Sequence, residues 1–238
     1  FLNTLKVFGA DKINVILDNS SEETLEWMKE VSSDECTIIK SEFGFGGAFM
    51  LAFKSCIETM ADDDIVYFLE DDYVHKPESP NIILEGLSHF DYITLLDSYY
   101  KYTFRDRDSE TPSLFKISES CHWRSITTTP CTWACRVSTL KEDLDIHISW
   151  IRSLKRNPWT EKGIDFFNKN YAQHYSPIDQ SEFASGLPEC CLYDRLLKKG
   201  RTLGQPIPGY ADHINDRIRK LHTPFTDWIK VLDESLEN

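Results

Sequence analysis

Three consecutive acids, Glu70, Asp71 and Asp72, are the side chains best placed for chemistry, because they directly follow the apolar run 65–69. Adjacent carboxylates repel one another, so a cation is expected to compensate them. A hard divalent ion, which prefers oxygen ligands, is the simplest candidate. The alternative is a solvated acidic turn, and this is the interpretation we favour for Asp62 to Asp64. The length of the preceding apolar run favours a metal site at Glu70 to Asp72.

The run 65–69 predicts a strand buried on both faces, as in the middle of a parallel sheet. A strand that ends in carboxylates delivers them to the carboxyl edge of the sheet, where open α/β sheets bind ligands. Upstream, the pattern predicts, in order, a helix over 1–8, a strand over 13–17, a helix from 20, a strand over 36–39, a glycine-containing loop over 43–47 and a helix over 48–60. This order indicates a right-handed, parallel α/β unit.

The second half of the chain is less regular. Short strands are predicted over 92–96, 114–117 and 132–137, with helices over 140–157, 189–199 and from 224. The stretch 171–188 is rich in turn-forming residues and is predicted to be a mobile loop over the crevice. Residues 123–130 either line a pocket or form a threonine-rich edge strand. Aromatic residues in this half either stack on the rings of a ligand or pack in the core, namely Tyr99, Tyr100, Tyr102, Phe104, Trp123 and Trp133.

Composition narrows the class of protein. A chain of 238 residues with 41% hydrophobic residues can bury a substantial core. Its net charge of −13 argues against nucleic acid or an anionic membrane as a partner. No apolar run approaches the roughly 20 residues of a membrane span, and no signal peptide is visible. The seven cysteines do not suggest a disulfide framework, so we expect reduced thiols and a cytoplasmic location.

Five motifs, in this order, resemble those of nucleotide-sugar glycosyltransferases with the GT-A fold, of the family 2 type. They are the turn at Ile16 to Ser21, the glycine turn at Phe43 to Ala48, a DxD-like motif at Leu69 to Asp72, the segment Ser185 to Cys190 followed by Leu196 and Gly200, and the strand Pro206 to His213. The order and approximate spacing of the five motifs agree with the family across almost the whole chain.

The resemblance implies one GT-A domain over 1–238, with a nucleotide-binding half at 1–97 and an acceptor and metal half at 98–238. The fold class expected is α/β, Rossmann-like, with a mixed but mostly parallel sheet flanked by helices. The usual first strand of the family has no counterpart here and would lie upstream of Phe1. The oligomeric state is left open.

The resemblance also implies roles for individual residues. Asp18, with Asn19 beside it, would contact the base or ribose of the nucleotide. Glu70 and Asp72 would bracket the diphosphate through Mn²⁺ or Mg²⁺, with Asp72 favoured as the direct ligand. Asp71 would contact the ribose or the donor sugar. A further metal ligand would be His213.

One departure from the family pattern concerns the general base. The usual pair of acids is Glu189 and Cys190 in this chain, so the second acid is a thiol. Glu189 is the first candidate for the base, since a carboxylate is favoured at the start of a helix. Asp179 and Glu182 are the alternatives, and an ordinary acid at a helix N-terminus is the competing interpretation of Glu189.

The predicted function is metal-dependent transfer of a hexosyl or deoxyhexosyl group from a nucleotide-diphosphate sugar, with UDP-sugars favoured. The acceptor would be a glycan, a lipid-linked sugar or a protein. A single base acting in a direct displacement would invert the anomeric centre. Two other classes stay open. One is a sugar nucleotidyltransferase, and the other is a non-catalytic domain that binds a nucleotide-sugar or carbohydrate.

Overall fold

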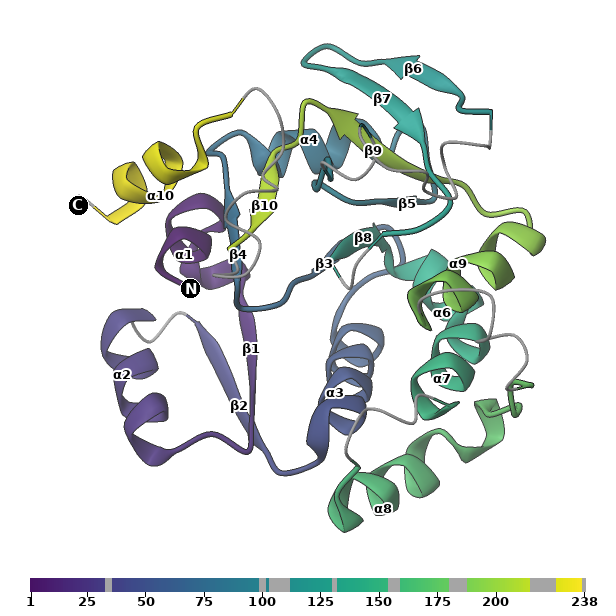
Figure 1. The fold of residues 1–238 in the computed structure, drawn as a ribbon. Helices are drawn as coiled ribbons and strands as arrows, with labels where there is room; N and C mark the ends of the chain where they lie inside the picture. The colour runs from purple at the N-terminus through teal and green to yellow at the C-terminus, as the bar shows by residue number, and fades with distance from the viewer. Residues whose placement is uncertain are drawn as a thin grey trace. The chain divides into compact units, whose positions relative to one another are not determined.

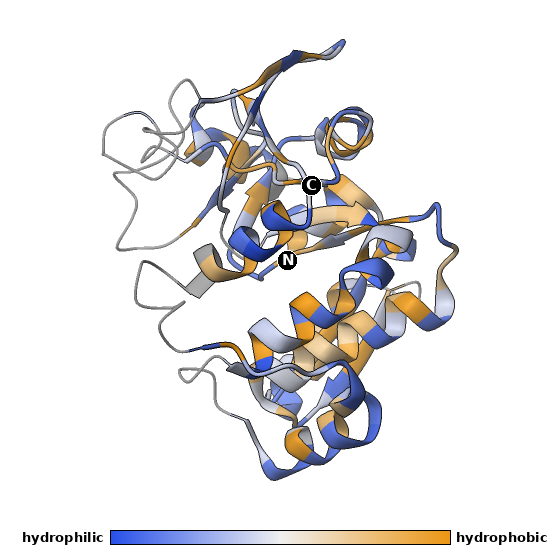
Figure 2. Cartoon of the chain, turned by 90° about the vertical axis from the view of Figure 1, so that its right-hand side faces the viewer, coloured by the Kyte–Doolittle hydropathy of each residue, from blue (hydrophilic) through white to orange (hydrophobic). Residues whose placement is uncertain are grey.

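A computed structural model describes residues 1–32, 36–98, 102, 112–129, 132–153, 159–179, 188–214 and 226–236. Packing divides the chain into two compact units that interleave along the sequence. Unit 1 comprises Phe1–Phe8, Ile65–Arg136 and Tyr193–Asn238, and unit 2 comprises Gly9–Asp64 and Val137–Leu192. We describe each unit by itself (Figure 1). In Figure 2 the helices carry both hydrophobic and hydrophilic residues, as expected for helices with one buried side.

Unit 2 contains a parallel pair of strands, β1 (Asn14–Asp18) and β2 (Thr37–Ser41), joined through helix α2 (Glu22–Ser32). In their register Asp18 lies opposite Ser41, so both strands end at the same edge. The other elements of this unit are η1 (Ala10–Lys12), α3 (Gly44–Thr59), α6 (Val137–Glu142), α7 (Leu144–Ser153), α8 (Glu161–Asn170) and η3 (Ala172–His174). Helix α9 (Pro188–Lys198) contains the boundary between the units.

The glycine-rich stretch after β2 is the first turn of α3, not the loop that the sequence predicts. Gly44 has a φ of 74°, a conformation that favours glycine. A Cβ atom on Gly47 would lie 2.4 Å from the Cβ of Phe43, and one on Gly163 would lie 2.0 Å from the Phe43 carbonyl oxygen. The glycines therefore let the N-terminal ends of α3 and α8 approach closely. Helix α3 begins at Gly44, within the predicted loop.

Unit 1 is built on a six-stranded sheet in the order β3-β8-β5-β9-β7-β6. Its strands are β3 (Ile65–Phe68), β5 (Tyr92–Ile93), β6 (Phe115–Ile117), β7 (His122–Ser125), β8 (Trp133–Arg136) and β9 (Leu203–Ile207). A separate antiparallel pair joins β4 (Tyr73–His75) to β10 (Ala211–His213). Unit 1 also contains the helices α1 (Leu2–Phe8), α4 (Ser79–Gly86) and α10 (Trp228–Leu236).

The mixed α/β class is confirmed, but parallel pairing is less common than the sequence predicts. In the six-stranded sheet β5 pairs with β9 in parallel, whereas the pairs β3–β8, β5–β8, β6–β7 and β7–β9 are antiparallel. Strand β3 alternates between half-buried and buried residues, and its described partner, β8, runs antiparallel to it. A run of five apolar residues is too short to reveal strand direction, which explains the difference.

Helix α4 packs against one face of this sheet. A Cβ atom on Gly86 would lie 2.3 Å from the ring of Trp123, which is fully buried. Ile82, Ile83 and Phe90 belong to the same apolar cluster. Trp133 is also buried, at 2% exposure. The two tryptophans therefore pack in the core and are not open to stack on a sugar.

Most predicted elements are present, with boundaries shifted by a few residues. The helix predicted over 140–157 is two helices, α6 and α7. The segment 206–213 is divided between β9 and β10. Residues 122–125 form β7, which lies between β9 and β6 and is not an edge strand. Among the described helices none is long and apolar enough to cross a membrane.

Candidate functional site

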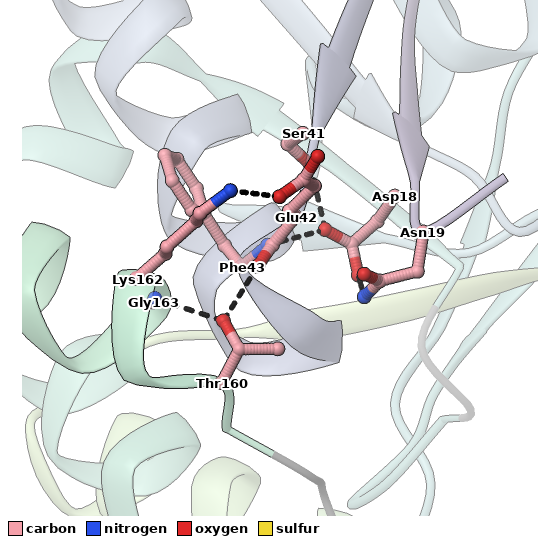
Figure 3. Close-up of polar contacts among 8 residues, drawn as sticks. All are labelled: Asp18, Asn19, Ser41, Glu42, Phe43, Thr160, Lys162 and Gly163. Atoms are coloured by element: carbon pink, nitrogen blue, oxygen red, sulfur yellow. Dashed lines mark hydrogen bonds and ion pairs between the residues drawn. The ribbon is translucent and has the colours of Figure 1, made fainter.

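In unit 2, the side chain of Asp18 forms hydrogen bonds with residues at the ends of two strands and at the start of a helix (Figure 3). Its Oδ1 accepts hydrogen bonds from the hydroxyl of Ser41 and from the backbone N–H of Phe43, both at 2.7 Å. Its Oδ2 accepts from Nδ2 of Asn19, also at 2.7 Å. Asn19 has a φ of 51°, which an asparagine in a turn tolerates. These contacts fix the orientation of the Asp18 carboxylate.

An open pocket with a volume of about 280 Å³ lies where β2 ends, lined by Lys40, Ser41, Glu42, Phe43 and Lys162. The hydroxyl of Thr160 donates to the carbonyl of Glu42 at 2.5 Å and accepts from the N–H of Gly163 at 3.0 Å, so it caps α8. Lys162 forms an ion pair with Glu42 and lowers the pKa of that carboxyl. The pocket therefore combines cationic side chains with the two groups, Ser41 and Phe43, that hold Asp18.

In unit 1, the pairing of β10 with β4 brings Asp72 and His213 together. His213 lies opposite Tyr73, and the N–H of Ile214 donates to the carbonyl of Asp72 at 2.7 Å. The Nε2 atom of His213 lies 2.6 Å from Oδ2 of Asp72. Oδ1 of Asp72 is buried and has no hydrogen-bond partner in the described part of the chain.

A buried carboxylate oxygen without a partner is costly unless a ligand satisfies it. The oxygen of Asp72 and the imidazole of His213 fit a divalent ion that keeps several waters and relies on few protein ligands. Among the described residues, no group of three or more His, Cys, Asp or Glu side chains is placed to hold a metal ion. Among the described residues, Asp72 and His213 are therefore the pair available to hold such an ion.

The other two acids of the triplet lie between β3 and β4. Glu70 is half-buried and Asp71 is exposed. The ring of Tyr73, the next residue, packs on His213 with a centroid distance of 5.1 Å. Asp72 and the ring of Tyr73 therefore both contact His213.

Of the three candidates for the general base, one has a described side chain. Asp179 is exposed. Glu189 belongs to the first turn of α9, but its side chain lies outside the described residues, as does all of Glu182. The predicted mobile loop over 171–188 is described up to Asp179, where it contains the short helix η3.

A buried polar cluster that the sequence did not reveal surrounds Asp97. Its Oδ1 accepts from Nη2 of Arg124 at 3.1 Å and from Nε2 of Gln205 at 2.6 Å, and its Oδ2 accepts from the hydroxyl of Tyr102 at 2.6 Å. Burial raises the pKa of Asp97 more than these partners lower it. The available signal was the position of Asp97 at the end of a predicted strand, but two of its partners, Arg124 and Gln205, come from distant segments.

Comparison with known families identifies the chain. Its residues 4–143 match the model of the family described as Glycosyl transferase family 2, which is more than half of the 238 residues. A search among curated proteins finds no match. The matched region includes the Asp18 turn and the acids at 70–72, and the mixed α/β architecture is consistent with the GT-A fold. The chain therefore belongs to glycosyl transferase family 2 and is a glycosyltransferase.

Proposed function

We propose that this glycosyltransferase moves a hexosyl or deoxyhexosyl group from a UDP-sugar to a hydroxyl group of a glycan or other acceptor, with inversion at the anomeric carbon. The observation that carries the proposal is the Asp72–His213 pair, with its 2.6 Å contact and the unsatisfied Oδ1 of Asp72. A carboxylate and an imidazole held in this way suit a divalent ion at a diphosphate.

Asp72 and His213 would hold Mn²⁺ or Mg²⁺, with Glu70 as a second carboxylate towards the diphosphate and Asp71 towards the ribose or donor sugar. When bound, the ion supplies positive charge that stabilises the departing diphosphate. The sheet register fixes His213 beside Asp72, which reduces the reorganisation needed to bind the ion.

Asp18 and Asn19 would contact the base or ribose of the nucleotide. Three hydrogen bonds orient the Asp18 carboxylate before any ligand arrives. A carboxylate has about four lone-pair sites, so one remains for an N–H or O–H of the ligand. The neighbouring pocket lined by Ser41 and Phe43 offers space of about 280 Å³.

Glu189 is proposed as the base that takes the proton from the acceptor hydroxyl. It belongs to the first turn of the 11-residue helix α9, where the helix dipole favours a carboxylate. Such a base contributes about 10²–10⁴-fold in rate. Asp179 and Glu182 are the alternatives, and Glu189→Gln, Asp179→Asn and Glu182→Gln distinguish them, since only the true base should lower turnover by this factor.

The test is hydrolysis or transfer with a panel of UDP-, GDP- and dTDP-sugars, in the presence of Mn²⁺ and of EDTA. We expect turnover with a UDP-sugar that depends on Mn²⁺. Absence of both turnover and metal-dependent nucleotide binding across the panel would contradict the proposal. Binding of a nucleotide-sugar without turnover would instead indicate a non-catalytic binding domain, which the Cys190 substitution makes the second candidate.

A further inference from the structure

Two rows of side chains run across strands β6, β7 and β9 on one face of the sheet in unit 1. Residues directly opposite one another in antiparallel strands project from the same face. The register of the three strands gives the rows Phe115–Arg124–Gln205 and Ile117–His122–Ile207. Among the described strands, β6 is the last at this end of the sheet (Figure 1).

The opposite face of the same strands is covered. It carries the row Lys116–Trp123–Pro206, in which Trp123 is fully buried. The ring of Trp123 packs so closely on α4 that a Cβ atom on Gly86 would lie 2.3 Å away. Helix α4 therefore covers the Trp123 face, and the face with Phe115 and Arg124 is the one turned away from α4.

The face that carries Phe115 and Arg124 is exposed to solvent at strand β6 and buried towards the middle of the sheet. Phe115 is 62% exposed and Ile117 is 73% exposed, both large values for apolar side chains. Gln205, two strands further in, is 1% exposed. The edge thus presents an aromatic and an aliphatic side chain to solvent, directly beside Arg124.

Arg124 is fixed in place and its charge is compensated. Its Nη2 donates to Oδ1 of the buried Asp97, and the ring of Tyr102 lies 5.0 Å from its Cζ atom. Tyr102 in turn donates to the same carboxylate, and its pKa is raised by burial and by Asp97, so it stays protonated as a donor. Nε of Arg124 is buried and the whole side chain is 13% exposed, so Arg124 belongs to the closed part of this face.

From this arrangement we infer that the face formed by the two rows docks a neutral oligosaccharide as the acceptor. The inference rests on the proposed function. The apolar C–H face of a sugar ring packs on an aromatic ring such as Phe115, while its hydroxyls hydrogen-bond with the exposed imidazole of His122, which lies opposite Ile117 on the same face. An anionic acceptor fits less well, because Asp97 already compensates Arg124 and the chain carries a net charge of −13.

The exposed area argues for a ligand of this size over a second copy of the chain. One aromatic side chain covers only about 150–250 Å² when fully buried, whereas a stable interface needs about 800 Å² from each partner. Phe115 and Ile117 together fall well short of that area, but they match one or two sugar rings.

The experiment is calorimetric titration of the protein, without nucleotide, with cellopentaose, maltopentaose and chitopentaose, and with uronic-acid-containing and phosphorylated oligosaccharides. We expect binding of a neutral oligosaccharide that Phe115→Ala weakens at least tenfold. Leu84→Ala is the matched control, because Leu84 is 58% exposed on α4, against the opposite face, and its removal should leave the affinity unchanged.

The inference is overturned if the charged oligosaccharides bind in preference, if none of the panel binds, or if Phe115→Ala and Leu84→Ala have the same effect. Sedimentation analysis that shows a dimer dissociated by Phe115→Ala would also overturn it, in favour of a second copy of the chain. Titration of the wild type with UDP and Mn²⁺ separates the two proposals. Nucleotide binding without oligosaccharide binding contradicts the acceptor site and leaves the proposed function standing.

Discussion

His213 contacts Asp72 through a distance of 2.6 Å between Nε2 and Oδ2, although the two residues are 141 positions apart in the chain. The register of β10 on β4, with His213 opposite Tyr73, sets this contact. A slip of one residue would turn side chains to the other face of the ladder. The pair therefore depends on correct strand pairing as much as on the identity of the two residues.

Asp18 is predicted to have separable structural and binding roles. Asp18→Ala leaves the N–H of Phe43 and the hydroxyl of Ser41 without their acceptor, so the free energy of unfolding should fall by about 1–3 kcal/mol. Asp18→Asn keeps one carbonyl oxygen as an acceptor, so it should fold, yet bind UDP about tenfold more weakly because a hydrogen bond to a charged group is lost. Urea unfolding and calorimetry measure the two effects. Unchanged UDP affinity in Asp18→Asn would show that the residue is purely structural.

Asp97 is predicted to be important for the stability of unit 1. It is fully buried, and Asp97→Asn leaves Arg124, whose side chain is 13% exposed, without a compensating charge. Removing one partner of a buried ion pair costs about 3–5 kcal/mol, and urea unfolding should show a loss of this order.

Glu234→Gln provides the control for Asp97→Asn. Glu234 pairs with Lys230 through side chains that are 63% and 70% exposed, so the ion pair should contribute no more than about 0.5 kcal/mol. Equal losses of stability in the two variants would contradict the structural role assigned to Asp97.

Because the imidazole of His75 is buried, we expect the folded protein to lose stability in mild acid. Burial lowers its pKa from 6.5 to about 3, and its Nε2 lies 2.9 Å from the hydroxyl of Tyr67. Between these values the unfolded chain binds a proton that the folded chain does not, so stability is full above pH 6.5 and falls as the pH drops towards 3. At pH 5 the loss from this group is about 2 kcal/mol, at 1.36 kcal/mol per pH unit.

The measurement is the free energy of unfolding at pH 7 and pH 5 for wild type, His75→Gln and His89→Gln. His75→Gln should lose about 2 kcal/mol less than wild type on acidification. His89→Gln removes an exposed imidazole and keeps His75, so it should retain the wild-type loss. The same acid sensitivity in all three proteins would show that His75 is not its source.

Local patterns in the sequence were sufficient to predict most elements. The apolar runs at β1, β2 and β3 and the turn at Asp18 were all apparent, because each depends on residues close in the chain. The glycines at 44–47 were misread as a loop, since their role is to admit Phe43 and α8, and Gly163 is more than a hundred residues away. Close packing between distant segments leaves no local signal.

The candidate site was predictable only in part for the same reason. Asp72 and His213 were singled out through a family resemblance, and the structure brings them together. The cluster of Asp97 with Arg124 and Gln205 was missed, because three strands must align before the hydrogen bonds exist. The exposed edge at Phe115 was missed because an apolar residue in a short strand predicts burial.

Calorimetric titration with UDP, in Mn²⁺ and in EDTA, tests the central claim most directly. Wild type should bind UDP about 10–100-fold more tightly in Mn²⁺ than in EDTA, which is the size of effect that residues around a metal site have on affinity. Asp72→Asn should lose that gain, while Asp63→Asn, in the exposed acidic turn after α3, should keep it. A gain with Mn²⁺ that survives Asp72→Asn, or no gain in wild type, would contradict the account.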